Sequence, residues 1–434
     1  MLALTFEIKH GRWMLCRCLG WATPRVHWSP LSTLRLREVP VPEPCGPDWV
    51  RLRTLLGGIC GTDLALVTLR NHPATFLRAF TSSPMMLGHE NVAVIDAVGP
   101  GVRGWRVGQR VCVEPSLSCV PRGIEPPCRP CAEGRFSLCE NLDAGALPPG
   151  AVIGVNNRTG GSWSPYFVAH ASQLHAVPDG VSDEAAVLVD PIACALHAVL
   201  RRPPADGERL AIVGGGVVGI GVAASLRATG RRNHVTAIVR HRHQGDWMRR
   251  YGADDVIEAP RRSAERYDRV AAAVGGRRVP GLFGNQGLIG GFDVVYDCVG
   301  TGSSMTDCMK FARAGGTVIV LGTAHISVVD LTPLWFAELT VIGANGRQIE
   351  DAPPGLAHPG GGLAPRRLHT YEIVFDLIRD GRLDIAPLLT HTFRLKDYRA
   401  AFEALTVGRR QGVIKVAFDH RDRAADSGTE GAST

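Results

Sequence analysis

The sequence predicts a protein with a doubly wound α/β domain, built on a parallel sheet, and a second, mostly β domain. From Arg209 onward, apolar strand-like segments alternate with helical segments, a pattern typical of a parallel sheet with helices on both faces. The first third of the chain contains short β segments separated by turns instead, which is typical of a small, irregular β domain.

The individual elements follow from local patterns. Strands are predicted for "MLALTFEI", "DWVRLRTLL", "ENVAVIDAVG" and "RVGQRVCVE", because their apolar residues alternate or run between glycines. "SDEAAVLVDPIACALHAVL" predicts one helix, with a start signal at Ser182 and Asp183 and apolar residues at helical spacing. The α/β alternation then runs through "RLAIVGGG", "VVGIGVAASLRATG", "HVTAIV", "FDVVYDCVG", "SSMTDCMKFARAGG", "TVIVLG" and "LTVIGANG".

Two stretches rich in glycine and proline, 277–291 and 351–367, interrupt this alternation and predict surface loops. After the second stretch, "TYEIVFDLIRDGRL" and "LKDYRAAFEALTVG" predict amphipathic helices, and "GVIKVAF" predicts a last strand. Residues 421–434 offer no apolar side chains for a core and predict a disordered tail.

Composition and charge argue against several classes of function. The 434 residues are 45% hydrophobic and 21% charged, as in ordinary globular proteins. The 48 basic residues, against 41 acidic ones, are spread along the chain, so a nucleic-acid partner is not expected. The longest uncharged apolar run, Leu210 to Leu226, is shorter than the roughly 20 residues of a membrane span, and the N-terminus shows no signal-peptide pattern. We therefore expect a cytoplasmic protein with no membrane partner, whose twelve cysteines stay reduced.

Gly214, Gly216 and Gly219 follow a buried strand in G-x-G-x-x-G order, at the head of a helix. Such glycines permit a tight turn, close approach of a pyrophosphate, and close packing of helix on strand. Free N–H groups at the helix N-terminus bind the phosphates. We interpret the turn as a dinucleotide site; a structural turn in another α/β fold is the alternative. We expect the cofactor also to contact residues beside this turn and at the end of "FDVVYDCVG", namely Val217, Val218, Val299 and Gly300.

The segment after the next predicted strand indicates which cofactor is bound. NAD-binding proteins usually place an acidic residue there, against the ribose hydroxyls. The stretch 231–245 contains no Asp or Glu, but it contains Arg240 and Arg242. A guanidinium suits a 2′-phosphate, so we predict a preference for NADP(H) over NAD(H). The alternative is that these are solvated arginines in an arginine-rich chain.

A group of four cysteines, Cys119, Cys128, Cys131 and Cys139, lies in a stretch rich in proline, glycine and arginine. Four thiolates on a compact loop can close a tetrahedral zinc site that orders a lobe with little core of its own. We predict a structural zinc site, since an ion with four protein ligands has no open position. The alternative, a zinc ribbon that binds nucleic acid, would show paired knuckles and a basic-aromatic surface, which this loop lacks.

A second group of possible metal ligands is Cys60 in "GGICGTDL" with His89 and Glu90 in "MLGHENVAV". A thiolate, an imidazole and a carboxylate suit a zinc ion that keeps one position for water or substrate. Each residue by itself has an ordinary structural explanation: Cys60 as a small buried apolar side chain, and His89 as a turn histidine.

Taken in order, "GICGTD", "GHE", the four cysteines, the glycine turn and "VDPIACALHAV" resemble the medium-chain, zinc-dependent alcohol dehydrogenase-like proteins. The resemblance covers about residues 1–420 and is strongest to the polyol, sugar and threonine dehydrogenase branch. It implies a homodimer or homotetramer with a GroES-like catalytic domain at 1–197, a zinc lobe at 115–142, a Rossmann domain at 198–343, and a return to the catalytic domain at 344–420.

Carried over residue by residue, the resemblance implies that Cys60 and His89 bind the catalytic zinc ion. Glu90 matches the acidic residue that ligates this ion directly or exchanges with water. Asp190 stands where the branch places its third protein ligand, commonly a glutamate. Because aspartate is one methylene shorter, Cys194, one helical turn later, is the alternative ligand.

The resemblance also implies the remaining roles. Thr62 matches the hydroxyl that passes the substrate proton toward solvent, and Asp63 is expected to be a structural partner of its loop. Eight residues separate Cys119 from Cys128, where the family usually has two. The implied reaction is reversible oxidation of a primary or secondary alcohol to an aldehyde or ketone. A zinc-independent enone or quinone reductase and a non-catalytic binding protein, which share the fold, are the alternatives.

Overall fold

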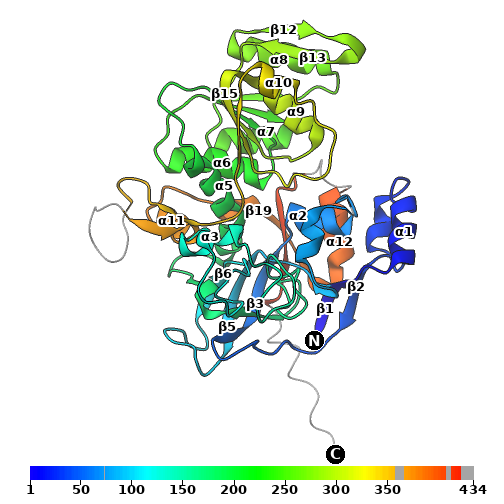
Figure 1. Ribbon diagram of the computed structural model, residues 1–434, viewed down its shortest axis with the longest axis vertical. Helices are drawn as coiled ribbons and strands as arrows, with labels where there is room; N and C mark the ends of the chain where they lie inside the picture. Colours follow the sequence, from blue (N-terminus) through cyan, green and yellow to red (C-terminus); the bar gives the residue numbers. More distant parts are fainter. Residues whose placement is uncertain (73, 357–365, 407–411, 422–434) are drawn as a thin grey trace, which may run out of the picture. The chain divides into compact units, whose positions relative to one another are not determined.

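The computed structural model describes residues 1–72, 74–356, 366–406 and 412–421, and the chain forms two compact units. Unit 1 consists of Met1–Asp190 and Asp384–Thr434, and unit 2 consists of Pro191–Leu383. The colours of Figure 1 show that unit 1 contains elements from both ends of the chain, in blue and in orange to red. None of the described helices is long and apolar enough to cross a membrane.

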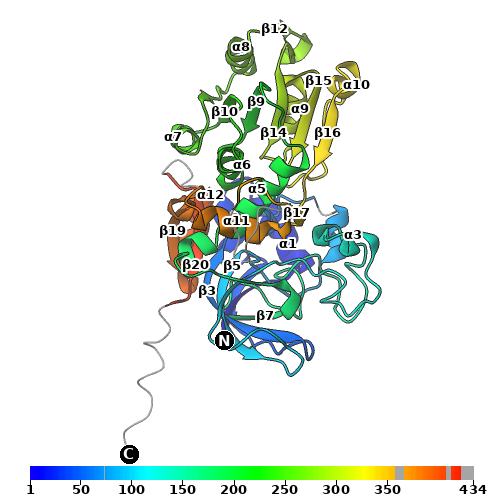
Figure 2. The same cartoon turned by 90° about the vertical axis from the view of Figure 1, so that its left-hand side faces the viewer.

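Unit 2 is built on a six-stranded parallel sheet, whose strands are β9 (Leu210–Val213), β10 (Val235–Val239), β11 (Asp255–Glu258), β14 (Phe292–Asp297), β15 (Ala312–Val320) and β16 (Thr340–Gly343). Their order is β11-β10-β9-β14-β15-β16, the 3-2-1-4-5-6 order of a Rossmann fold. Figure 2 shows β10, β9, β14, β15 and β16 side by side. β9 and β10 are buried along nearly their whole length, as their unbroken apolar runs predicted.

Helices join these strands, as the alternation in the sequence predicted. Apolar side chains of α8 and α9, including Tyr267, Val270 and Phe311, are buried against the sheet in one core. The helices of this unit are α5 (Val189–Arg201, which begins in unit 1), α6 (Val217–Ala228), α7 (Arg242–Arg250), α8 (Ser263–Val274), α9 (Gly302–Phe311), α10 (Thr332–Phe336) and α11 (Thr370–Arg379).

Unit 1 is built on a seven-stranded mixed sheet, formed by β3 (Trp49–Gly58), β5 (Asn91–Val98), β6 (Arg110–Val113), β7 (Tyr166–His170), β8 (Leu174–Ala176), β19 (Leu389–Arg394) and β20 (Lys415–Asp419). The order is β19-β20-β3-β5-β6-β8, and β7 also pairs with β3. β20 runs antiparallel to β3, with Ala417 opposite Gly58. This pairing brings the C-terminal strand beside the strand that leads to Cys60.

The remaining elements of unit 1 are a smaller sheet and a set of helices. A small sheet has the strand order β2-β1-β4, with β1 (Leu2–Phe6), β2 (Leu34–Glu38) and β4 (Met85–Met86). The helices are α1 (His10–Leu19), α2 (Gly61–Val67), α3 (Arg129–Ala132), α4 (Asp183–Ala186) and α12 (Tyr398–Thr406).

An aromatic core fixes the strand end that precedes the first candidate site. Trp163 is fully buried and makes edge contacts with Phe402 and Phe418, at ring-centroid distances of 5.6 and 5.5 Å. Burial of each phenylalanine contributes roughly 1.5–3 kcal/mol. The indole Nε1 of Trp163 donates to the carbonyl oxygen of Gly58, at 2.9 Å. The core thereby holds the backbone two residues before Cys60.

The single helix predicted from Ser182 is in fact two helices, α4 and α5, separated by Val187 and Leu188. Pro191 explains the break, because proline has no N–H for the carbonyl of residue 187 but is tolerated in the first turn of a new helix. The helix predicted over "SSMTDCMKFARAGG" also ends early. Its last five residues belong to β15, where Ala312 pairs with Phe292.

The prediction of a surface loop over 277–291 is wrong, because these residues form a β-hairpin. β12 (Arg277–Pro280) pairs antiparallel with β13 (Gln286–Ile289). Polar side chains stabilise it: Arg278 donates to Asp268 at 2.7 Å and to Gln286 at 2.9 Å. Polar contacts of this kind give no alternating apolar pattern in the sequence. The segment was therefore predicted to be a loop because of its many glycines.

The second predicted loop, 351–367, lies mostly outside the described residues. Its ends form another short antiparallel pair, β17 (Ile349–Asp351) with β18 (Arg367–His369). The predicted disordered tail, 421–434, is described only at Arg421. The prediction is wrong for this residue, because its guanidinium donates to Glu184 at 2.8 Å and to Asp419 at 2.7 Å.

The boundaries of the two units differ from those expected from the sequence, at 197/198 and 343/344. Residues 191–197 and 344–383 cluster with unit 2. An ion pair between His197 on α5 and Glu350 on β17 links these two segments within the unit. The helical pattern that runs across Asp190 and Pro191 gives no sign of a boundary there.

Candidate zinc and cofactor sites

The structure brings Cys60, His89 and Glu90 together, with one possible ligand atom from each lying within 4.8 Å of the others. Cys60 follows β3 and is the N-cap residue of α2, while His89 and Glu90 directly precede β5. Pairing of β3 with β5 aligns the two segments, and Gly58 N donates to the carbonyl oxygen of Glu90 at 3.0 Å. Sulfur, nitrogen and carboxylate ligands in one group suit a zinc ion with an open position.

Asp63 orients two members of this group, as its expected structural role implied. It is buried, with Oδ1 lying 3.5 Å from His89 Nδ1, and its Oδ2 accepts from the backbone N–H of Cys60 at 3.4 Å. Burial opposes protonation of His89, but Asp63 and Cys60 together raise its pKa well above the usual value. A carboxylate behind a histidine fixes which ring nitrogen faces a metal.

Lys415 is a site residue that the sequence reasoning missed. Its Nζ donates to Glu90 Oε1 at 2.5 Å, and both side chains are buried. Burial raises the pKa of Glu90, and Asp190 adds to this effect, while Lys415 and His89 oppose it. Lys415 could have been found from the sequence, because it is one of the few lysines of the chain and it lies inside the apolar run "GVIKVAF". Lys415 supplies a positive charge next to the candidate metal ligands.

Gly58 is required by the close approach of Glu90. A Cβ atom at position 58 would lie 2.2 Å from Glu90 Oε2 and 2.8 Å from Glu90 Cβ. Neither distance is possible for real atoms, so a larger residue here would displace the carboxylate from the group.

The other residues expected near this group have different positions. Asp190 is buried in the first turn of α5. Its charge contributes to raising the pKa of both Glu90 and Lys415. Among the described residues, however, its carboxylate is not part of the group formed by Cys60, His89 and Glu90. Cys194 lies one turn later on α5, in unit 2. Thr62 is half-buried in the first turn of α2, two residues after Cys60.

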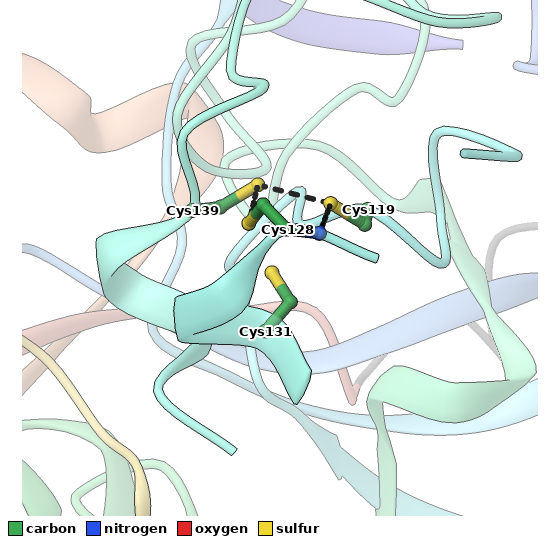
Figure 3. A group of neighbouring side chains, drawn as sticks. All are labelled: Cys119, Cys128, Cys131 and Cys139. Carbon is green, nitrogen blue, oxygen red and sulfur yellow. Dashed lines mark hydrogen bonds between the residues drawn. The ribbon is translucent and has the colours of Figure 1, made fainter. Parts of the chain in front are cut away.

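The four lobe cysteines also come together, with all four sulfur atoms within 4.8 Å of one another (Figure 3). The sulfur of Cys139 lies 3.7 Å from that of Cys119 and 4.0 Å from that of Cys128. A tetrahedral zinc site with Zn–S bonds of about 2.3 Å has S···S distances of about 3.8 Å. The group therefore has the size of a zinc–thiolate centre, and it includes Cys119 despite the long spacing to Cys128.

N–H groups around the four sulfurs favour thiolates. The backbone N–H of Cys128 donates to Cys119 Sγ at 3.3 Å, and Asn141 Nδ2 donates to the same sulfur at 3.2 Å. Burial alone would raise the pKa of Cys119, but these donors lower it to about 7. The backbone N–H of Asn141 donates to Cys139 Sγ at 3.4 Å. Burial raises the pKa of Cys139 to about 11 and raises that of Cys131 as well, so the donors favour the thiolate form of Cys119 in particular.

The three glycines of the turn after β9 meet three distinct requirements. Gly214 has a φ of +111°, a region in which side chains are strained. A Cβ atom at Gly219 would lie 1.9 Å from the carbonyl oxygen of Gly214, so α6 can pack against β9 only with glycine there. A Cβ atom at Gly216 would meet no atom within 4 Å, which leaves room for a pyrophosphate. Val217 and Val218 form the first turn of α6, and the N-terminus of a helix has free N–H groups that can bind phosphate.

The loop after β14, which contains Val299 and Gly300, lies next to this turn. A Cβ atom at Gly214 would lie 2.8 Å from Val299 Cγ2. Buried Asp297 accepts hydrogen bonds from the backbone N–H groups of Val299 at 3.0 Å and Gly300 at 3.1 Å. Gly300 has a φ of +77°. These loops follow the carboxyl ends of β9 and β14, where open α/β sheets bind nucleotides.

Arg240 and Arg242 are exposed at the carboxyl end of β10 and the start of α7. Between and beside them, the rings of His241 and His243 stack with a centroid distance of 5.6 Å and an interplanar angle of 8°. The structure thus places both arginines where the sequence predicted, at the end of the second strand of the sheet.

Comparisons with known proteins agree with this arrangement. Residues 46–179 match the family model described as alcohol dehydrogenase GroES-like domain, and residues 217–358 match the model described as zinc-binding dehydrogenase. L-idonate 5-dehydrogenase of Vitis vinifera is 28% identical over 393 residues, covering 90% of this chain and 92% of that protein. L-threonine 3-dehydrogenase of Aeromonas salmonicida (strain A449) is 29% identical over 380 residues, covering 87% and 94%.

Among solved structures, a short chain alcohol dehydrogenase from E. coli CFT073, complexed with NADH, has a TM-score of 0.69 to this chain at 22% identity, covering 96% of this chain and 99% of that one. This likeness shows the fold. The two family models lie in different units and together span more than half of the chain. The chain belongs to the zinc-dependent, medium-chain alcohol dehydrogenase family, in the branch of the polyol and threonine dehydrogenases, and is an oxidoreductase of CH–OH groups.

Proposed function

We propose that this chain oxidises an alcohol reversibly to an aldehyde or ketone at the group formed by Cys60, His89 and Glu90. The observation that carries the proposal is the presence of a thiol, an imidazole and a carboxylate within 4.8 Å, in a protein that also contains a Rossmann glycine turn. Cys60, His89 and Glu90 would hold a zinc ion, which would supply Lewis-acid chemistry at the C–O group, and the residues of the glycine turn would hold the nicotinamide cofactor that supplies the hydride chemistry.

The surrounding residues supply orientation and proton transfer. Asp63 holds the His89 ring and the Cys60 backbone in place. The hydroxyl of Thr62, in the first turn of α2, passes the proton of the alcohol toward solvent. The resemblance implies Asp190, which is buried at the start of α5, as a further ligand, with Cys194 as the alternative. Cys119, Cys128, Cys131 and Cys139 hold a second, structural zinc ion.

Replacement of Cys60 by alanine tests the catalytic assignment. Loss of Lewis-acid stabilisation, worth several kcal/mol, should lower turnover roughly a thousandfold or more. The cofactor should still bind, because the glycine turn is unchanged. Cys18→Ala, at an exposed cysteine of α1, is the matched control and should keep full turnover. Full activity of Cys60→Ala with an active control would disprove the assignment.

For the cofactor, we propose NADP(H) in preference to NAD(H). Arg240 and Arg242 supply positive charge where an acidic residue would favour NAD(H), and the segment 231–245 offers no carboxylate. Arg240→Ala should weaken NADPH binding about 10- to 100-fold, the value of a charge-assisted hydrogen bond, and leave NADH binding unchanged. Arg232→Ala, at an exposed arginine before the same strand, is the control. Equal affinity of the unmodified chain for both cofactors would refute the preference.

The relatives indicate a substrate class. L-idonate and L-threonine dehydrogenases are named for small molecules with several polar groups around the reacting alcohol. We propose a small polar secondary alcohol as the substrate, oxidised by a cytoplasmic homodimer or homotetramer. A screen of sugar alcohols and hydroxy amino acids with both cofactors, combined with the mass of the protein in solution, tests these points.

A further inference from the structure

The eight-residue segment between Cys119 and Cys128 contains an arginine, Arg122, whose side chain is completely buried. Its guanidinium is hydrogen-bonded only to backbone carbonyl oxygens among the bonds described. The acceptors are those of Leu117 at 2.8 Å, Ala144 at 2.8 Å, Leu147 at 3.1 Å, Pro148 at 3.3 Å and Gly150 at 2.6 Å. Burial of a guanidinium on neutral acceptors is costly unless a negative charge compensates it.

These acceptors lie on both sides of the cysteine group in the sequence. Leu117 precedes Cys119, whereas 144–150 follows Cys139. The backbone of Arg122 makes the same link, because its N–H donates to the carbonyl of Cys119 at 3.1 Å and its carbonyl accepts from Ala146 at 2.9 Å. Arg122 therefore joins the segment that carries Cys119 to the segment that follows Cys139.

The negative charge that compensates Arg122 comes from the cysteine group and Asp143. Burial lowers the pKa of Arg122, and Cys139, Asp143 and Cys119 oppose that shift in this order. Four thiolates around one divalent ion carry a net charge of about −2. A zinc–thiolate centre at the four cysteines would therefore add negative charge to that of Asp143.

We propose that Arg122 is a positioning residue of the structural zinc site. It holds the segments of Cys119 and Cys139 in register and balances the charge of the zinc–thiolate centre. The long segment between Cys119 and Cys128 thus adds a buried positive charge, that of Arg122, to the lobe. The role rests on the proposed zinc occupancy of the four cysteines.

The test measures zinc retention in a Cys60→Ala background, where only the structural ion is counted. Arg122→Met removes the positive charge and the N–H donors of the guanidinium. Arg122→Lys keeps the charge but not the planar set of N–H donors. Arg129→Met is the matched control, since that arginine lies in the same lobe with its side chain 85% exposed. Loss of a residue that supports metal ligands typically costs 10–100-fold in metal affinity. We expect zinc transfer to a coloured chelator to be about 10–100 times faster for Arg122→Met, intermediate for Arg122→Lys and unchanged for Arg129→Met.

A folded Arg122→Met protein that releases zinc at the parental rate would overturn this role alone. A parent protein with no zinc would instead overturn the assignment of the four cysteines, and the role with it. If Arg122→Met does not fold, hydrogen exchange of the unsubstituted lobe gives the answer. Removal of zinc should increase exchange at Ala146 and Gly150 together with the cysteine segment, and unchanged exchange at those two amides would contradict the proposal.

Discussion

Lys415 and Glu90, beside the first candidate zinc site, show which kinds of residue can and cannot be predicted from a sequence. Cys60, His89 and Glu90 were predictable because each lies in a short motif of residues with metal-binding chemistry. Lys415 was not, because it meets Glu90 across a separation of 325 residues, through the pairing of β20 with β3. Its contact depends on a long-range strand register that no local pattern encodes.

At the same scale, His27 gives unit 1 a predictable dependence on pH. Its side chain is 7% exposed, and burial, with Arg70 and Arg17, lowers its pKa to about 4. The folded state therefore resists protonation of His27, while the unfolded chain binds a proton near pH 6.5. The stability from neutral His27 is complete above pH 6.5 and is lost as the pH falls toward 4, by up to about 3 kcal/mol.

This prediction is measured by urea unfolding of the unsubstituted chain and of His27→Gln between pH 7 and pH 4. Other groups titrate in both proteins, so the informative quantity is the difference between their free energies of unfolding. The advantage of the unsubstituted chain should shrink as the pH is lowered. A difference that stays constant with pH would show that the folded state binds a proton at His27 as readily as the unfolded chain does, and would contradict the lowered pKa.

At the scale of elements, two glycines of the turn between β9 and α6 have different roles: Gly219 allows the helix to pack on the strand, and Gly216 leaves space for the cofactor. A methyl group at Gly219 would collide with the backbone of Gly214, whereas one at Gly216 meets open space. We expect Gly219→Ala to destabilise unit 2 by about 1–3 kcal/mol through overpacking and to impair cofactor binding. Gly216→Ala should keep its stability and bind the cofactor about tenfold or more weakly, because the methyl occupies the approach of the pyrophosphate.

Thermal unfolding and titration of cofactor fluorescence on both variants measure this contrast. Equal stability of the two proteins would show that helix α6 can move away from β9 at little cost. Unchanged cofactor affinity of Gly216→Ala would show that the pyrophosphate does not approach this turn.

Elements with strong apolar patterns could be predicted, and those held by polar contacts could not. β9 and β10 were predicted because they are buried along nearly their whole length. The β12–β13 hairpin was missed because Arg278 holds it through Asp268 and Gln286 rather than through an apolar face. The break between α4 and α5 was missed for another reason. A proline such as Pro191 is tolerated in the first turn of a helix but interrupts a longer one, so the sequence did not show which of the two applies here.

For the whole molecule, the sequence predicted two domains and a return of the chain to the first. The boundaries at Asp190 and Leu383 were not predictable, because α5 continues across the first boundary as a single helix. The two candidate zinc groups both lie in unit 1, and the glycine turn lies in unit 2. We therefore expect zinc binding to depend on residues of unit 1 and cofactor binding to depend on residues of unit 2.

We propose that unit 1 holds one catalytic and one structural zinc ion at separate sites. Elemental analysis of zinc per chain, on the unsubstituted protein and on Cys60→Ala, tests it most directly. We predict about two zinc ions per chain, falling to about one in Cys60→Ala, because the four cysteines keep their ion. About one zinc ion in both proteins would contradict the account, since only the cysteine lobe would then be occupied.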